Sequence, residues 1–265
     1  MDEEHSYLAG PYPRAFAHRG WHTGELSGLE NSMSAFRRAI YEGYRYLEID
    51  VHATLDGVVV VHHDPMLDRT TDSYGPIAAL PWSAVRRARI GGVEPVPRLD
   101  ELLAELPSAL LNIDVKADSA VQPTIEVLNR TGAVDRVCVA SFSDSRLRTV
   151  RMLGGPNLLT SMGPRSVAAL RFGGRFPVLP TRRMISGRMA QVPETHTVGG
   201  RRITVVNQRM IHTAHEYGCE VHVWTVDDEP TMHRLLDLGV DGLITDRPDV
   251  LRAVLHARGG WPQRV

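Results

Sequence analysis

A regular alternation of short apolar, strand-like runs with amphipathic, helix-like runs is the feature of this sequence that most constrains its fold. The first strand-like run covers residues 15–20, and the helical pattern that follows at 31–43 places apolar side chains on one face and ends in glycine. This order recurs and predicts parallel strands that are joined by helices. Further strands are expected at 46–51, 110–115, 136–142, 157–161, 220–226 and 242–245, and further helices at 99–106, 124–132, 145–154, 165–173, 207–218, 229–239 and 249–258.

Seven strand-and-helix units are clear in the 265 residues, and an eighth strand is expected between Phe176 and Val206, at Met189 to Val192. Eight units close a TIM (β/α)8 barrel, an α/β fold that commonly has about this length. We therefore expect a single barrel domain over residues 1–265. A doubly wound open sheet is the alternative, which is disfavoured because no glycine-rich fingerprint follows the first strand.

Two stretches interrupt this rhythm. Residues 65–97 are rich in proline and glycine, and they follow an extended run at 57–62. We expect them to form a small insertion after the second strand, over the mouth of the barrel, with a short helix near 82–89. Residues 172–202 are rich in glycine and arginine, and apart from the strand expected at Met189 to Val192 their pattern assigns no secondary structure.

Composition and charge exclude several classes of function. The net charge of −1 creates no field that would attract nucleic acid or an anionic membrane. The apolar runs are too short to span a bilayer, and the first residues lack the pattern of a signal peptide. Cys138 and Cys219 are expected to be buried free thiols. These features favour a cytoplasmic protein, and nothing in the sequence indicates its oligomeric state.

Polar side chains occur where the expected strands end, which is where the active sites of parallel barrels lie. Residues two apart on a strand point to the same face, so each pair of polar residues should project together into the barrel mouth. The first, second and third strands end with His18 and Arg19, with Glu48 and Asp50, and with Asp114 and Lys116. Lys116 is the only lysine among the 30 basic residues.

Three converging carboxylates, Glu48, Asp50 and Asp114, would repel one another strongly unless a cation lay between them. Carboxylate oxygens suit Mg²⁺ or Ca²⁺, so we expect one of these metals as the cofactor. The alternative is an ion-pair cluster with Arg19 and Lys116. These two cations would also supply fixed positive charge for a phosphoryl group.

Histidines near this cluster could exchange protons at neutral pH. His18 lies beside Arg19 at the end of the first strand, and His63 follows the extended run 57–62. Strand alternation should direct His62 away from His63. His52 shares a face with the carboxylates of the second strand but lies beyond them.

The sequence resembles the glycerophosphodiester phosphodiesterase family. The match is most specific over the first 71 residues, where several motifs follow one another in order. The matching segments are His18-Arg19-Gly20, Glu30-Asn31-Ser32, Glu48-Ile49-Asp50-Val51, Thr54-Leu55-Asp56-Gly57, His63-Asp64, Arg69-Thr70-Thr71, Asn112-Ile113-Asp114-Val115-Lys116, Ser141-Phe142, Val223-Trp224-Thr225-Val226-Asp227 and Asp241-Gly242-Leu243-Ile244-Thr245-Asp246-Arg247-Pro248.

The resemblance implies a TIM-barrel hydrolase that cleaves glycerophosphodiesters to glycerol 3-phosphate and an alcohol. It also implies roles for individual residues: metal ligands Glu48, Asp50 and Asp114; a catalytic pair His18 and His63; phosphate-binding Arg19 and Lys116; a supporting loop with Glu30 and Asn31; and an aromatic wall of the substrate pocket, Trp224. We favour His63 as the base and His18 as the acid.

One position departs from the family pattern, because the third strand carries Asp114 where glutamate is usual. Aspartate is one methylene shorter, so the metal would lie closer to this strand or bind through a water molecule. Mg²⁺ tolerates such displacement less well than Ca²⁺, and the identity of the metal stays open.

Three other functions were weighed. A phospholipase D-like activity on lysophospholipids or sphingomyelin would call for an exposed apolar rim on the insertion. Ile77, Leu80 and Trp82 are candidates for this rim, but packing onto the barrel explains them equally well. An amidohydrolase-like zinc barrel would use histidines such as His52, but the first strand lacks the usual histidine pair. A metabolite-binding module would be expected to have lost one of the catalytic residues.

Overall fold

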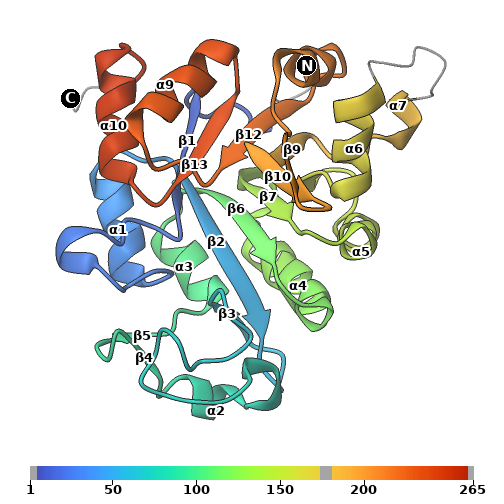
Figure 1. The fold of residues 1–265 in the computed structure, drawn as a ribbon. Coiled ribbons are helices and arrows are strands. Elements are labelled where there is room, and N and C mark those ends of the chain that lie inside the picture. Colours follow the sequence, from blue (N-terminus) through green and yellow to red (C-terminus); the bar gives the residue numbers. More distant parts are fainter. Residues whose placement is uncertain (1–4, 174–180, 262–265) are drawn as a thin grey trace.

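The computed structural model describes residues 5–173 and 181–261. Within this part of the chain, eight parallel strands surround a central axis and helices cover their outer side (Figure 1). The strands are β1 (Arg14–His18), β2 (Tyr46–Ala53), β6 (Leu110–Val115), β7 (Val137–Ala140), β8 (Leu159–Thr160), β9 (Met189–Pro193), β12 (Glu220–Trp224) and β13 (Gly242–Thr245).

The ring of strands is nearly closed. The strands are paired in the order β8-β7-β6-β2-β1-β13-β12-β9. A parallel bridge between Ser161 and Met189 joins the two ends, and Met162 N donates to Met189 O at 2.8 Å. The TIM-barrel prediction is therefore confirmed, and the open-sheet alternative is wrong. The strand expected at Met189 to Val192 is β9.

The helices follow the amphipathic runs of the sequence. Several begin at a side chain that caps the first turn: Ser32 Oγ accepts from Ala35 N, and Asn207 Oδ1 accepts from Met210 N. The α-helices that cover the barrel are α1 (Met33–Tyr41), α3 (Leu99–Glu105), α4 (Val121–Thr131), α5 (Asp144–Gly154), α6 (Pro164–Gly173), α8 (Gln208–Glu216), α9 (Glu229–Leu238) and α10 (Pro248–Ala257). Shorter helices are η1 (Gly24–Leu26), η3 (Asp118–Ala120), η4 (Val134–Arg136) and α7 (Thr181–Met184).

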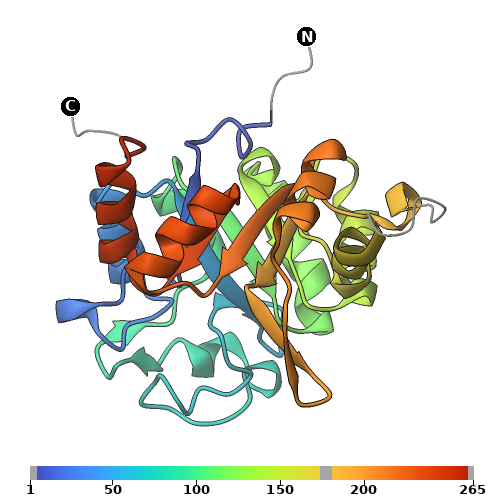
Figure 2. The ribbon, with the colours of Figure 1, turned by 45° about the horizontal axis from the view of Figure 1, so that its top comes forward.

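Two additions extend from one end of the barrel (Figure 2). After β2 the chain returns in the antiparallel strand β3 (Val59–Val61), and residues 65–97 then form η2 (Ile77–Ala79), α2 (Trp82–Val85), β4 (Arg89–Ile90) and β5 (Glu94–Pro95). The helix expected near 82–89 is shorter than the pattern suggested. The second addition, a hairpin of β10 (Thr195–Val198) and β11 (Arg201–Thr204), was not expected from the sequence. Residues 174–180 of the unassigned stretch lie outside the described residues.

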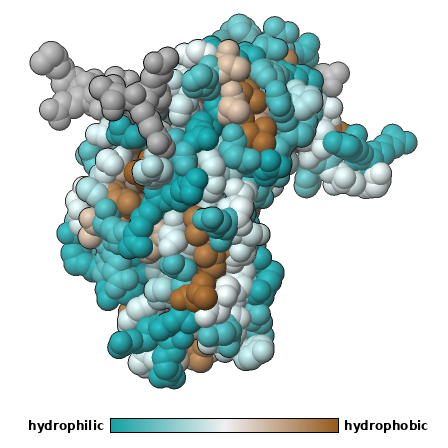
Figure 3. All heavy atoms as spheres, turned by 90° about the vertical axis from the view of Figure 1, so that its left-hand side faces the viewer, coloured by the Kyte–Doolittle hydropathy of each residue, from teal (hydrophilic) through white to brown (hydrophobic). Residues whose placement is uncertain are grey.

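The outer surface carries no membrane-spanning element in the part of the chain that the structure describes, because no helix there is both long and apolar enough to cross a bilayer. Figure 3 shows the side that bears α1, α10 and the insertion. That side is mostly hydrophilic, with hydrophobic residues in narrow strips.

A buried polar network fills the end of the barrel opposite these additions. Arg14 donates from Nε and Nη2 to the two oxygens of Glu220, at 2.6 Å each, and from Nη1 to the Tyr46 hydroxyl. His222 Nε2 also lies 2.9 Å from Glu220 Oε2. Burial alone would raise the pKa of Glu220, but the hydrogen bonds from Arg14 and His222 lower it to about 2.

This network predicts a pH dependence of stability. The pKa of Glu220 is below its ordinary value of 4.5, so its stabilising effect is complete above that pH and is lost as the pH falls toward 2. Glu220→Gln should lower the free energy of unfolding by about 3 kcal/mol at neutral pH, because Arg14 loses its charged partner. Urea unfolding between about pH 5 and pH 3 should also show a shallower decline in this variant than in the wild type.

Glu126→Gln is the matched control, since Glu126 is an exposed carboxylate on α4. Equal pH profiles for the wild type and Glu220→Gln would contradict the prediction.

Candidate active site

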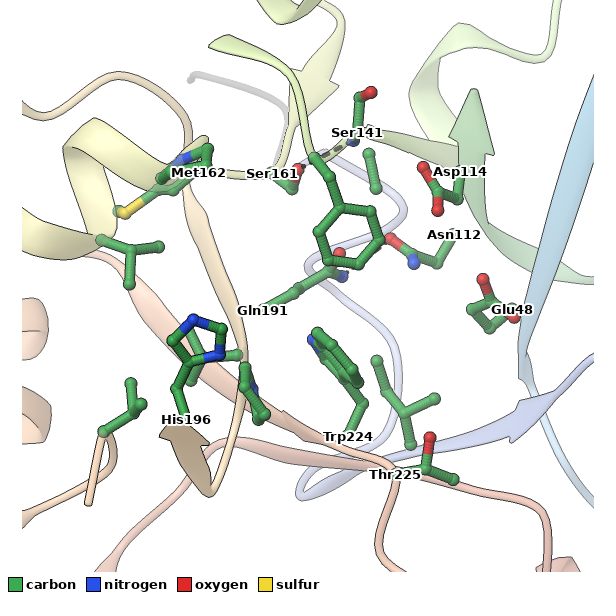
Figure 4. A pocket seen from close by; sticks show the side chains of 18 of the residues that line it. Glu48, Asn112, Asp114, Ser141, Ser161, Met162, Gln191, His196, Trp224 and Thr225 are labelled. Carbon is green, nitrogen blue, oxygen red and sulfur yellow. Dashed lines mark hydrogen bonds between the residues drawn. The ribbon is translucent and has the colours of Figure 1, made fainter. Parts of the chain in front are cut away.

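A cavity of about 630 Å³ opens at the carboxyl ends of the strands. Its lining includes Glu48 on β2, Asn112 and Asp114 on β6, and Trp224 on β12, which Figure 4 shows projecting toward one space. Among the residues predicted from the sequence, His18, His63, Arg19, Glu48, Asp114, Lys116 and Trp224 line the cavity. Asp50, Glu30 and Asn31 do not line it but contact residues that do.

Strand register places the carboxylates together. His18 on β1 is paired with Glu48, and Asp50 on β2 is paired with Asp114 on β6. All three carboxylates are buried. The same-face spacing read from the sequence therefore brings acidic groups from two neighbouring strands into one small volume.

Two cations neutralise part of this charge. Lys116 Nζ lies 2.7 Å from Asp50 Oδ1 and 2.6 Å from Asp114 Oδ2, and Arg19 Nε lies 3.1 Å from Asp50 Oδ2. Burial opposes ionisation of Asp50, but Lys116 and Arg19 outweigh it and lower the pKa of Asp50. Burial and the nearby Asp50 raise the pKa of Glu48, and burial raises that of Asp114.

The donor set fits a hard divalent cation. Asp50 Oδ1 and Asp114 Oδ1 are buried and accept no hydrogen bond, although Lys116 Nζ lies close to Asp50 Oδ1. Within residues 5–173 and 181–261, no three acidic, histidine or cysteine side chains are arranged to hold a metal ion. Lys116 Nζ lies between two of the expected ligands, so the ligand set stays a prediction.

His18 is held between two carboxylates. Its Nδ1 donates to Asp246 Oδ1 at 2.6 Å, and its Nε2 lies 3.6 Å from Glu48 Oε2. Burial lowers the pKa of His18, but these two carboxylates raise it more, so the net shift is upward. His22 Nε2 also lies 3.2 Å from Asp246 Oδ1. The sequence predicted no role for Asp246, although this residue directly follows the eighth strand, where active-site residues of parallel barrels lie.

His63 has a carboxylate partner of its own. Its Nδ1 donates to Asp64 Oδ1 at 2.6 Å, and Arg69 Nε donates to Asp64 Oδ2 at 2.5 Å. Arg69 also donates to Glu30 Oε1 at 2.7 Å, which in turn accepts from Arg19 Nη1 at 2.9 Å. Hydrogen bonds from Arg69 lower the pKa of Asp64. Glu30 thus connects Arg19 to Arg69, which holds the Asp64 partner of His63.

The other two histidines contact the backbone around His63. His62 points away from the cavity, as alternation predicts, with Nδ1 2.8 Å from Asp64 O and Nε2 2.9 Å from Thr70 Oγ1. His52 Nε2 lies 3.1 Å from His63 O. Burial lowers the pKa of both His52 and His62. Among the described residues, neither joins His63 in a group of three side chains that could hold a metal ion.

A tight turn fixes the start of the site. Arg19 and Asn31 both have left-handed backbone conformations, with φ of 55° and 58°, and Asn31 N donates to Arg19 O at 2.9 Å. Asn31 Nδ2 donates to Asp50 Oδ2 at 2.9 Å. Gly20 has a φ of 87°, and a Cβ there would lie 2.9 Å from Ala35.

The sequence predicted no role for several other residues that line the cavity. Gln191 on β9 donates to Asn112 on β6 at 2.8 Å, across the bottom of the cavity. Phe142 and Trp224 meet edge to face, with ring centroids 5.4 Å apart. Phe142 belongs to a segment that the sequence singled out, but contacts between distant strands leave no local pattern.

Ile77, Leu80 and Trp82 do not form the apolar rim that a phospholipase D-like activity would call for on the insertion. Ile77 is fully buried, and Leu80 and Trp82 pack against the same small core inside the insertion. The part of the cavity lining that the structure describes includes none of the three. Apolar side chains at the mouth come instead from α6 and the β10–β11 hairpin.

Comparison with known proteins identifies the family. The pattern of the glycerophosphoryl diester phosphodiesterase family matches residues 18–250. The chain belongs to this family. It is therefore a phosphodiesterase hydrolase, and the amidohydrolase alternative is wrong.

Relatives of the family span nearly the whole chain. "Probable glycerophosphodiester phosphodiesterase 2" of Mycobacterium tuberculosis is 40% identical over 93% of this chain and 92% of its own length. Lysophospholipase D GDPD1 of Homo sapiens is 26% identical over 91% of this chain and 85% of its own.

Solved structures share the fold. A phosphodiesterase of Oleispira antarctica in complex with the product sn-glycerol-3-phosphate has a TM-score of 0.76 and 21% identity, over 95% of this chain and 99% of that one. A glycerophosphodiester phosphodiesterase from Agrobacterium tumefaciens has a TM-score of 0.71 and 23% identity, over 91% and 99%. At these identities the likeness concerns the fold.

The turn at Gly20 yields a stability prediction. Gly20→Ala combines an unfavourable φ with a Cβ too close to Ala35, and we expect it to lower the free energy of unfolding by about 3 kcal/mol. Gly57→Ala, with a φ of 79° and open space around its Cβ, should cost about 1 kcal/mol. Urea denaturation of both variants tests the difference, and equal losses would contradict the close approach at Gly20.

Proposed function

We propose that this phosphodiesterase hydrolyses glycerophosphodiesters to glycerol 3-phosphate and an alcohol, with two histidines as acid and base and a divalent metal ion as cofactor. The main support is the polar end of the cavity, where two histidine–aspartate pairs lie beside a cluster of carboxylates and cations. The names of the relatives and the product held by the Oleispira phosphodiesterase support this substrate class.

Arg19 and Lys116 would bind the phosphate. Both line the cavity and form ion pairs with Asp50, and the carboxylates beside Lys116 raise its pKa. Fixed positive charges beside a phosphodiester stabilise the extra negative charge that develops as a nucleophile attacks. The edge-to-face pair of Trp224 and Phe142 would form the wall next to the phosphate.

The two histidines would move protons in opposite directions. Asp64 accepts a hydrogen bond from Nδ1 of His63. The Nε2 of His63 is then free to take a proton from the attacking hydroxyl. As that oxygen bonds to phosphorus, the bond to the leaving oxygen breaks, and His18 Nε2–H donates a proton to it. Glu48 and Asp246 favour the protonated form of His18 that this step needs. If the glycerol 2-hydroxyl attacks, a cyclic phosphate forms and water opens it in a second displacement.

Glu48, Asp50 and Asp114 would hold the metal ion, Mg²⁺ or Ca²⁺. When bound, such an ion supplies positive charge that stabilises the phosphoryl oxygens. The buried Oδ1 of Asp114, which accepts no hydrogen bond, supports this assignment. Asn31 would orient Asp50, and Glu30 would orient Arg19. The short side chain of Asp114 leaves the choice of metal open.

The proposed ligands are small glycerophosphodiesters, and neither nucleic acid nor a membrane-spanning segment is part of the proposal. We propose a cytoplasmic location, which the two free, buried thiols Cys138 and Cys219 support because reducing compartments preserve free cysteines.

Histidine variants test the mechanism on glycerophosphocholine. His18→Ala and His63→Ala should each lower kcat by about 10²–10⁴-fold, because each removes one proton transfer. His212→Ala is the matched control, since His212 is an exposed histidine on α8. Near-wild-type turnover by either active-site variant would refute the paired-histidine scheme.

A further inference from the structure

We propose that this protein binds to the surface of an anionic lipid bilayer through a basic face formed by α6, α7 and the β10–β11 hairpin. The basic face consists of the exposed side chains Arg165, Arg183, Arg201 and Arg202, together with the exposed apolar side chains Phe172, Met184 and Ile203. The inference concerns the surface to which the protein binds, so it goes beyond the reaction proposed above.

Charge is distributed unevenly along the chain. Residues 164–173 and 181–209 contain eight arginines and a single acidic residue, Glu194. Their net charge is therefore +7, and because the whole chain carries −1, the remainder carries −8. The small net charge of the chain thus conceals a strongly basic part, and a local positive field of this kind attracts anionic surfaces.

Contacts between α6, α7 and the hairpin bring these residues to one side of the barrel. The guanidinium of Arg171 on α6 donates to Thr204 O of the hairpin at 3.1 and 3.2 Å. Ser166 Oγ, also on α6, donates to Met184 O of α7 at 3.1 Å. Figure 1 shows α6 between α7 and β10, so the basic face extends from the hairpin across α6 to α7.

The arginines of the basic face keep their charge available for a partner. Arg165 is 81% exposed, and its Nε lies 4.0 Å from the nearest carboxylate oxygen, on Asp144. Among the described residues, neither Arg183 nor Arg201 forms an ion pair with an acidic side chain. Arg202 Nε donates to a neutral group, Thr195 Oγ1, at 3.0 Å.

Acidic side chains offset these charges very little. Glu194, the one acidic residue of residues 181–209, is already paired with Arg234 at 2.9 Å. An exposed arginine elsewhere, Arg247, lies 2.8 Å from the carboxylate of Asp249. The basic face therefore differs from other parts of the surface in its unpaired cations as well as in its composition.

Apolar side chains among the arginines favour a bilayer as the anionic partner. Phe172 is 47% exposed, Met184 is 49% exposed and Ile203 is 39% exposed. At a membrane surface such side chains enter the acyl region while the arginines contact lipid phosphates. A nucleic acid duplex offers phosphates without an apolar layer, so it would leave these side chains in water.

The test measures co-sedimentation of the full chain with phosphatidylglycerol vesicles and with phosphatidylcholine vesicles. At about 50 mM NaCl we expect at least about tenfold tighter binding to phosphatidylglycerol, and a smaller preference at about 300 mM NaCl, because salt screens the charges. Equal binding to both vesicles, or binding to neither, would overturn the inference.

Charge-reversal variants locate the surface. Arg201→Glu/Arg202→Glu on the hairpin and Arg165→Glu/Arg183→Glu on α6 and α7 should each weaken binding to phosphatidylglycerol vesicles by at least about tenfold. They change different elements, so a folding defect in one pair leaves the other informative. Arg86→Glu/Arg87→Glu is the matched control, since both arginines are exposed on the insertion. An equal loss in the control would overturn the assignment to this face.

Two further measurements separate a bilayer from a soluble polyanion. A DNA duplex added at the same phosphate concentration should leave most of the protein on the vesicles, whereas complete displacement would overturn the choice of a bilayer. Ile203→Ser should weaken vesicle binding by at least about threefold, because one apolar side chain no longer enters the acyl region. Unchanged binding by this variant would contradict the apolar contribution. None of these measurements requires turnover, so their outcome is independent of the proposed function.

Discussion

The active site depends on a buried set of ion pairs. Lys116 pairs with both Asp50 and Asp114, and Arg19 pairs with Asp50. Parallel strand register brings carboxylates from β2 and β6 to the same height, where burial would otherwise force them to take up protons. Lys116 and Arg19 lower the pKa of Asp50 and so keep it ionised. At Glu48 the nearby positive charge does not offset burial and the charge of Asp50, and the pKa is raised. The barrel thus buries three carboxylates with different pKa shifts in one small pocket.

The same barrel end supplies proton transfer through two separate histidine–aspartate pairs. His18 is oriented by Asp246 from β13, and His63 by its neighbour Asp64. Arg69 links Asp64 to Glu30, which also fixes Arg19. Phosphate binding and proton transfer are therefore connected by a continuous set of charged side chains.

The sequence predicted the barrel and most of its polar end for a definite reason. Buried parallel strands are apolar throughout, so polar residues such as Glu48 and Asp114 stand out where strands end. It did not predict the pairing of His18 with Asp246, because this contact joins the first and last strands. Nor did it predict the β10–β11 hairpin, whose exposed residues lack an apolar alternation. The sequence left two positions open for Ile77, an exposed rim or a packed interior, because composition does not tell which surface an apolar side chain covers; the structure buries it.

Calorimetric titration of the metal-free protein with Mg²⁺ and with Ca²⁺ tests the central claim most directly, because it measures cation binding without relying on turnover. The proposed oxygen ligands Glu48, Asp50 and Asp114 predict one saturable site for at least one of these ions. Glu48→Gln, which removes one carboxylate and keeps the size of the side chain, should weaken that binding by at least about tenfold. Absence of binding, or equal binding by the variant, would contradict the account.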